Sequence, residues 1–160
     1  MNNTEKFLQL INNPFKLRLF LLSKLPSAFF SGVRVLVADE EKCVVTVPYK
    51  WFSKNPFRST YFACLSMAAE MSTGVLAMAH LYKRDPAVSM LVTRVTGNFN
   101  KKAVSRSTFT CEDGLLIKKT IEDAISSKEG KVITVKSFGR NPDGEIVAEF
   151  DITWSFKARS

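Results

Sequence analysis

Residues 54–74 read KNPFRSTYFACLSMAAEMSTG, and the fold is decided in this stretch. From Tyr61 to Ala79 every side chain is apolar, small or hydroxyl-bearing, with Glu70 as the one exception. A helix that is apolar on all sides has to be covered by other parts of the protein. The stretch therefore predicts a long central helix, from about residue 58 to residue 80, that carries a single carboxylate.

The expected ends of this helix are polar. Ser59 or Thr60 can cap its first turn, and Pro86 lies beyond its last turn. Residues 59–82 are long enough to cross a membrane, but a carboxylate at the centre of a bilayer would need a partner of its own. We therefore interpret the stretch as the buried helix of a soluble protein and expect no transmembrane segment.

The residues around the central helix have the patterns of strands. Residues 33–49, VRVLVADEEKCVVTVPY, are β-branched on both sides of a charged turn, which indicates a hairpin. Further strands are expected at residues 88–99, 103–111, 131–138 and 146–157, with a short amphipathic helix at 114–127. Antiparallel strands that follow one long helix predict an α+β fold.

Two short helices are expected at the N-terminus, at residues 4–11 and 14–25. Because Lys16, Arg18 and Lys24 accompany their Phe and Leu residues, these helices have two interpretations. They lie on a membrane surface, or they cover a sheet edge or the mouth of a pocket. We expect one domain over residues 1–160, with residues 1–25 as a helical segment and 26–160 as the core.

The composition favours an anionic partner and a reducing compartment. Lys and Arg number 23 against 15 Asp and Glu, a net charge of +8. The three cysteines, Cys43, Cys64 and Cys111, are widely spaced and form no CxxC pair, as expected of reduced thiols in the cytoplasm. His80 is the only histidine, which argues against a catalytic metal site.

Glu70 is the residue that most needs an explanation. Its helical face is formed mostly by small residues, which leave room for something to approach the carboxylate: Ala63, Ser66, Met67, Thr73, Gly74 and Ala77. A buried carboxylate without a partner costs free energy or takes up a proton. Glu70 is therefore either a structural residue, paired with an arginine or capped by hydroxyls such as those of Ser66 and Thr73, or a catalytic group.

The spacing around Glu70 resembles that of a known family. Asn55 stands six residues before Tyr61, and Glu70 stands nine after it. This is similar to the asparagine, turn and acid of the hotdog-fold acyl-CoA thioesterases, in particular the PaaI-like group and its DUF4442-type relatives. The resemblance covers roughly residues 26–157. It implies a hotdog fold, in which a curved antiparallel sheet wraps around the central helix, with Glu70 as general base or nucleophile and Asn55 positioning a water or the thioester.

The sequence departs from the family at the turn, where Tyr61-Phe62-Ala63 replaces His-Gly-Gly. A helix N-terminus can polarise a carbonyl without glycine, and the hydroxyl of Tyr61 either assists or lies in the core or an interface. The resemblance implies substrate contacts of two kinds. Those near the acyl group and thioester are Phe62, Ala63, Ser66 and Thr73, and those near the phosphates of coenzyme A are Arg58, Lys101, Lys102 and Arg106. The four bases have an alternative interpretation as ordinary solvated surface.

The sequence thus predicts a cytoplasmic homo-oligomer, a dimer or a dimer of dimers, that hydrolyses an acyl-CoA thioester. Coenzyme A would enter as part of the substrate, with no metal and no separate cofactor. One alternative is a hotdog protein that binds acyl groups or lipids without catalysis. The other is a nucleic-acid binder, which only the net charge supports, so no nucleic acid is expected as a partner.

Overall fold

The computed structural model describes residues 1–159 and begins with three helices. These are α1 (Asn3–Ile11), α2 (Pro14–Lys24) and α3 (Pro26–Phe30). Asn2 and Glu5 form a reciprocal capping box at the start of α1, and the side chain of Asn13 caps α2. The first two helices were predicted. The third was missed because it is a single short turn that begins at a proline.

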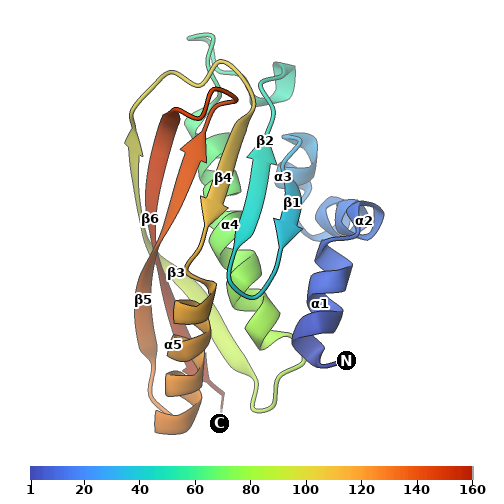
Figure 1. Cartoon of the computed structure of the whole chain (residues 1–160), viewed down its shortest axis with the longest axis vertical. Helices are drawn as coiled ribbons and strands as arrows, with labels where there is room; N and C mark the ends of the chain where they lie inside the picture. Colours follow the sequence, from blue (N-terminus) through green and yellow to red (C-terminus); the bar gives the residue numbers. More distant parts are fainter. Residues whose placement is uncertain (160) are drawn as a thin grey trace.

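Six strands form one antiparallel sheet in the order β1-β2-β4-β5-β6-β3. They are β1 (Arg34–Ala38), β2 (Cys43–Val47), β3 (Val88–Phe99), β4 (Ser107–Cys111), β5 (Lys131–Arg140) and β6 (Ile146–Ala158). Between β4 and β5 the chain forms the predicted helix α5 (Gly114–Ser127). The sheet curves around one long helix, α4 (Phe62–Leu81), as Figure 1 shows. This is the α+β hotdog arrangement that the sequence predicts.

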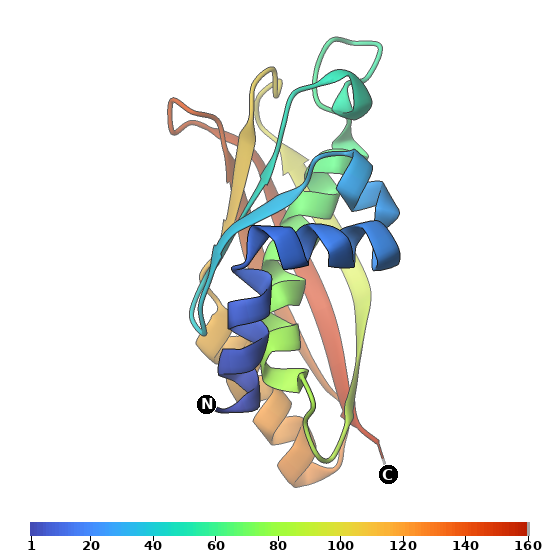
Figure 2. The same cartoon turned by 90° about the vertical axis from the view of Figure 1, so that its right-hand side faces the viewer.

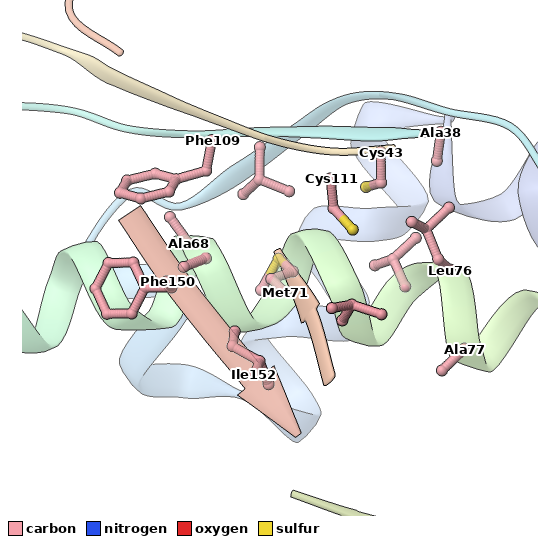
Figure 3. Packing of buried hydrophobic residues seen from close by; sticks show 14 of the residues in the cluster. Ala38, Cys43, Ala68, Met71, Leu76, Ala77, Phe109, Cys111, Phe150 and Ile152 are labelled. Carbon is pink, nitrogen blue, oxygen red and sulfur yellow. The ribbon is translucent and has the colours of Figure 1, made fainter. Parts of the chain in front are cut away.

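The core lies between α4 and the concave face of the sheet. Figure 3 shows Ala68, Met71 and Leu76 of α4 among inward-facing side chains such as Phe109 of β4 and Phe150 of β6. On its other sides α4 contacts α1 and α5. It is the one helix among residues 1–159 that is long and apolar enough to span a bilayer, but these elements enclose most of it, as expected of a core helix.

Two buried polar contacts tie α4 to the sheet. The hydroxyls of Ser72 and Ser137 lie 2.8 Å apart, and the indole N–H of Trp154 donates to the hydroxyl of Thr73 at 2.9 Å. Because the partners sit on β5 and β6, these contacts fix both the rotation and the position of the helix along its axis. A buried hydroxyl or indole N–H without such a partner would destabilise the fold.

The predicted N-cap of the central helix is wrong by one or two residues. Its N-cap is Tyr61, which offers no side-chain hydrogen bond to the helix, rather than Ser59 or Thr60. Both hydroxyls are used elsewhere: that of Ser59 bonds the side chain of Asn55, and that of Thr60 donates to the carbonyl of Ala103. The latter contact also helps to explain why β4 begins at Ser107 instead of residue 103.

Strand β3 forms one edge of the sheet, and its outer side has no partner strand among the described residues. It is long, and Leu91, Val95 and Phe99 expose about half or more of their side chains. A long apolar edge strand is a template for pairing with another chain. Two copies that pair through β3 would cover this edge and the half-exposed side of α4 together.

We expect the protein to be a homodimer through β3 at micromolar concentration. Introducing charge with Leu91→Lys and Val95→Lys would place like charges across a two-fold axis, so this variant is expected to be monomeric. Static light scattering of both proteins checks the prediction. A wild-type chain that scatters as a monomer would contradict it.

Candidate active site

A cavity of about 720 Å³ opens where three segments meet. These are the loop of residues 54–61, the first turns of α4, and the connection of residues 99–103 that follows β3. Five residues predicted for the site line it: Asn55, Tyr61, Phe62, Lys101 and Lys102. The other nine lining residues were not predicted for the site: Lys54, Pro56, Phe57, Ser59, Thr60, Leu65, Phe99, Asn100 and Ala103.

Asn55 organises the loop that forms one wall of the cavity. Its amide oxygen accepts hydrogen bonds from the backbone N–H of Phe57 at 3.0 Å and of Ser59 at 3.2 Å. Its amide nitrogen donates to the hydroxyl of Ser59 at 3.0 Å. The Asn55 side chain thus stabilises the turn of residues 55–59 through local hydrogen bonds, which is a common role of asparagine. Whether it also contacts substrate stays a prediction.

The N-terminus of α4 offers free hydrogen-bond donors to this cavity. The N–H of Tyr61 donates to the carbonyl of Ser53 at 2.8 Å, which fixes the residue that precedes the helix. The N–H groups of Phe62 and Ala63 make no hydrogen bond to a described residue. Such groups at a helix N-terminus carry a partial positive charge and suit a carbonyl oxygen that becomes negative.

Aromatic rings continue from the cavity into the core. Tyr61 and Phe62 are about half exposed, and their rings lie 5.0 Å apart. Phe62 meets Phe99 edge-on at 6.5 Å, and Phe99 meets Phe150 at 5.7 Å. Part of the cavity wall is therefore apolar and aromatic. Phe99 could have been predicted, because it ends a clear strand two residues before Lys101.

Glu70 lies two turns further along α4 and does not line the cavity. It is half-buried, and its side chain makes no hydrogen bond or ion pair with any residue from 1 to 159. One carboxylate oxygen lies 3.2 Å from the point where a Cβ on Gly74 would be, beside the ring of Trp154. Burial raises the pKa of Glu70 above its ordinary value.

The missing Cβ of Gly74 therefore makes room for this carboxylate. The predicted alternative of a Glu paired with a base or with hydroxyls is not what the described residues show. Thr73 is engaged elsewhere, because its hydroxyl donates to the backbone carbonyl of Glu70 and accepts from Trp154. Ser66 donates to the carbonyl of Phe62 at 2.8 Å.

The other predicted contacts are spread over the molecule. Ala63 and Ser66 lie half-buried on the side of α4 that leads from Phe62 to Glu70, whereas Thr73 is fully buried. Arg58 is exposed on the loop, and Arg106 lines a different cavity. Their roles toward a substrate stay predictions.

Other nucleophiles and ligand sets are poorly placed. His80 lies at the last turn of α4, about 27 Å along the helix from Phe62. All three cysteines are buried and free, and burial raises the pKa of Cys111 to about 12. No cluster of three metal-ligating side chains exists among residues 1–159.

Comparison with known families agrees with this geometry. The family model described as a domain of unknown function, DUF4442, matches residues 18–156. The chain belongs to the DUF4442 family. The match covers α4, α5, the candidate site and all of the sheet except the last two residues of β6, and it confirms the family that the spacing of Asn55, Tyr61 and Glu70 suggests. A comparison with the sequences of curated proteins gives no match.

Solved structures share the fold of this DUF4442 protein. A "probable thioesterase" from Pseudomonas aeruginosa has 19% identity and a TM-score of 0.76, and the match covers 91% of this chain and 97% of the other. The PaaI protein of the E. coli phenylacetic acid degradation operon has 15% identity and a TM-score of 0.66, with 99% and 97% covered. A thioesterase from Haemophilus influenzae has 11% identity and a TM-score of 0.61, with 88% of both chains covered.

We expect Glu70→Gln to stabilise the protein at neutral and alkaline pH. Because burial raises the pKa of Glu70, the folded chain binds this proton more tightly than the unfolded chain. The resulting stability is complete below the unfolded pKa of about 4.3 and is lost as the pH rises through the higher folded pKa. The variant should therefore melt above the wild type at about pH 8 and level with it near pH 4.

Thermal melting across this pH range measures the difference. Glu112→Gln, which removes an exposed carboxylate before α5, is the matched control and should change little. A Glu70→Gln variant that melts well below the wild type at alkaline pH would show that the carboxylate has a stabilising partner instead.

Proposed function

We propose that this DUF4442 protein hydrolyses an acyl-CoA thioester, with Glu70 as the general base. The observation that carries the proposal is a half-buried carboxylate with a raised pKa and no partner among residues 1–159, on a helix whose N-terminus opens into a cavity. Structures that share the fold at low identity are described as thioesterases, which supports the same reaction class. The free, buried cysteines suit a protein of the cytoplasm.

The distance along α4 favours a site built from two subunits. Glu70 follows Phe62 by eight residues, which is about 12 Å of helix, too far for both to act on one carbonyl. In the proposed dimer the two α4 helices lie side by side in opposite directions. Glu70 of one copy then approaches the free N–H groups at the start of α4 in the other.

In this arrangement the thioester carbonyl accepts hydrogen bonds from the N–H groups of Phe62 and Ala63. Glu70 removes a proton from a water, and the water oxygen forms a bond to the carbonyl carbon as negative charge moves onto the carbonyl oxygen. The carbon–oxygen double bond then re-forms as the carbon–sulfur bond breaks. The thiolate of coenzyme A leaves and takes the proton that Glu70 received from water, which returns the carboxylate to its starting form. The reaction needs only water and the thioester.

A non-catalytic role in acyl or lipid binding is the second candidate. The observation in its favour is that the rings of Tyr61 and Phe62 occupy the start of α4, where the family resemblance implies a compact His-Gly-Gly turn. A hydrolysis screen across acyl chain lengths separates the two, because a binding protein would retain the thioester without cleaving it.

We expect Glu70→Gln to lower turnover by about two or more orders of magnitude, since the general base is removed while the shape is kept. Asn55→Ala should also lower turnover, because the loop beside the cavity loses its hydrogen bonds. Gly74→Ala is a second probe of the carboxylate: its methyl group would displace Glu70. Steady-state hydrolysis measures all three.

Thermal melting provides the control for these variants. Glu70→Gln should melt at or above the wild type, because a buried charge is removed. Gly74→Ala should fold about as stably as the wild type, because alanine improves helix propensity by up to about 1 kcal/mol, which offsets the displacement of Glu70. Full activity in Glu70→Gln would end the catalytic assignment of this residue.

We also expect coenzyme A to bind through its phosphates to Lys101 and Lys102, so that Lys101→Ala with Lys102→Ala weakens binding about tenfold and reduces its dependence on salt. The ammonium of Lys101 already lies 2.6 Å from Glu145, in an exposed ion pair that a phosphate could replace. Glu145→Gln, which removes the competitor, should bind coenzyme A at least as tightly. Isothermal titration checks these affinities, and an unchanged double variant would place the phosphates elsewhere.

A further inference from the structure

Apolar side chains gather on the outside of the molecule around α2, α3 and the short turn η1 (Trp51–Ser53). We call this region the α2–η1 surface, and its apolar members are between 45% and 85% exposed: Phe15, Leu19, Leu22, Phe30, Trp51 and Phe52. Exposed apolar residues are common singly, but a cluster of this kind marks a binding surface.

Helix α2 is apolar on two faces, and only one of them is covered. Leu17 and Leu21 are buried against the rest of the chain. Phe15, Leu19 and Leu22 follow the spacing of four and three that places them on one outward stripe. Figure 2 shows α2 lying across the outside of the molecule, with α3 and the turn of residues 51–53 above it.

Ring contacts connect the three elements into one surface. The rings of Trp51 and Phe52 lie 5.9 Å apart, and Phe52 lies 5.9 Å from Phe30 of α3. Arg18 of α2 sits over the ring of Phe29 at 4.1 Å. Three of the exposed aromatic residues, Phe30, Trp51 and Phe52, are therefore in ring contact, and Arg18 connects α2 to α3.

A basic hollow lies between these elements. It has a volume of about 250 Å³, and four positively charged side chains line it: Arg18, Arg34, Lys50 and Arg106. None of the four makes an ion pair with a residue from 1 to 159, and no carboxylate lines the hollow. An uncompensated cluster of this kind attracts a phosphate-bearing ligand.

The chain segments that build this surface are free of acids. No Asp or Glu occurs between Glu5 and Asp39, nor between Glu41 and Glu70. Arg34 is the first residue of β1, whereas the acidic hairpin turn begins at Asp39, after the last residue of that strand. The positive charge on this side of the molecule is thus not cancelled locally.

We propose that the α2–η1 surface docks the protein on membranes that contain anionic phospholipids. The exposed Phe, Leu and Trp side chains would enter the interfacial layer, where aromatic rings are favoured, while the bases of the hollow hold headgroup phosphates. A lipid surface fits because it is the partner that offers a plane of phosphates and apolar chains directly beneath it. The surface lies toward β1, the sheet edge opposite β3, so a dimer through β3 leaves it uncovered.

Vesicle binding by the full chain tests this proposal without any thioester, so its outcome is independent of the proposed hydrolysis. Vesicles of pure phosphatidylcholine are compared by sedimentation with vesicles of which about a third is phosphatidylglycerol. We expect the anionic vesicles to bind at least about tenfold more tightly, with binding that weakens as salt rises. Trp51 fluorescence should shift to the blue on binding, and Trp51→Phe should bind without the shift, because Trp154 is buried.

Two double variants separate the apolar and the basic contributions. Trp51→Ser with Phe52→Ser should weaken binding to anionic vesicles about tenfold, and Arg34→Ser with Lys50→Ser should abolish the preference for them. The matched controls are Leu115→Ser with Leu116→Ser, which removes exposed apolar residues from α5, and Lys119→Ser with Lys157→Ser, which removes two exposed charges elsewhere. Both controls should bind like the wild type.

Four results would overturn the proposal. They are absence of binding to either vesicle, equal binding to both, equal losses in the controls, and displacement of the protein from vesicles by duplex DNA or inorganic phosphate at matched ionic strength. A change of mass in Trp51→Ser with Phe52→Ser, measured by light scattering, would instead assign the surface to contact between copies of the chain.

Discussion

The structure depends on enclosing α4, a helix without a polar face. The sheet curves around it, α1 and α5 cover further sides, and two buried hydrogen bonds to β5 and β6 fix its rotation. What the chain leaves half-buried is the side of α4 that carries Ala63, Ser66 and Glu70. The same requirement that folds the protein therefore also determines where a ligand or a second subunit can reach the helix.

The candidate site combines two different electrostatic environments on one helix. At its start the free N–H groups of Phe62 and Ala63 favour negative charge. Two turns later Glu70 lies beside Gly74 and Trp154, in surroundings that disfavour negative charge. Its carboxyl group therefore holds a proton more tightly. A reaction in which a proton leaves water while an oxygen becomes anionic uses both environments at once.

The fold could be predicted from the sequence because each pattern that indicates an element lies within one segment of the chain. The apolar run of α4, the alternation in β6 and the hairpin of β1 and β2 each predict one element without reference to the others. The first residue of α4 could not be predicted. Ser59 and Thr60 are favourable N-cap residues, but their hydroxyls form hydrogen bonds with Asn55 and Ala103 instead. The spacing of Asn55, Tyr61 and Glu70 predicted the family, but spacing along the chain did not show that Asn55 bonds within its own loop.

Ser53 anchors the segment between β2 and α4. It is fully buried, its hydroxyl contacts the carbonyls of Pro48 and Lys50, and its own carbonyl accepts the N–H of Tyr61. The exposed Trp51 and Phe52 directly precede this buried serine, and Tyr61 of the cavity wall is held by its carbonyl. The exposed α2–η1 surface and the wall of the cavity are therefore connected through one buried serine, whose backbone and side chain bond to both neighbouring segments.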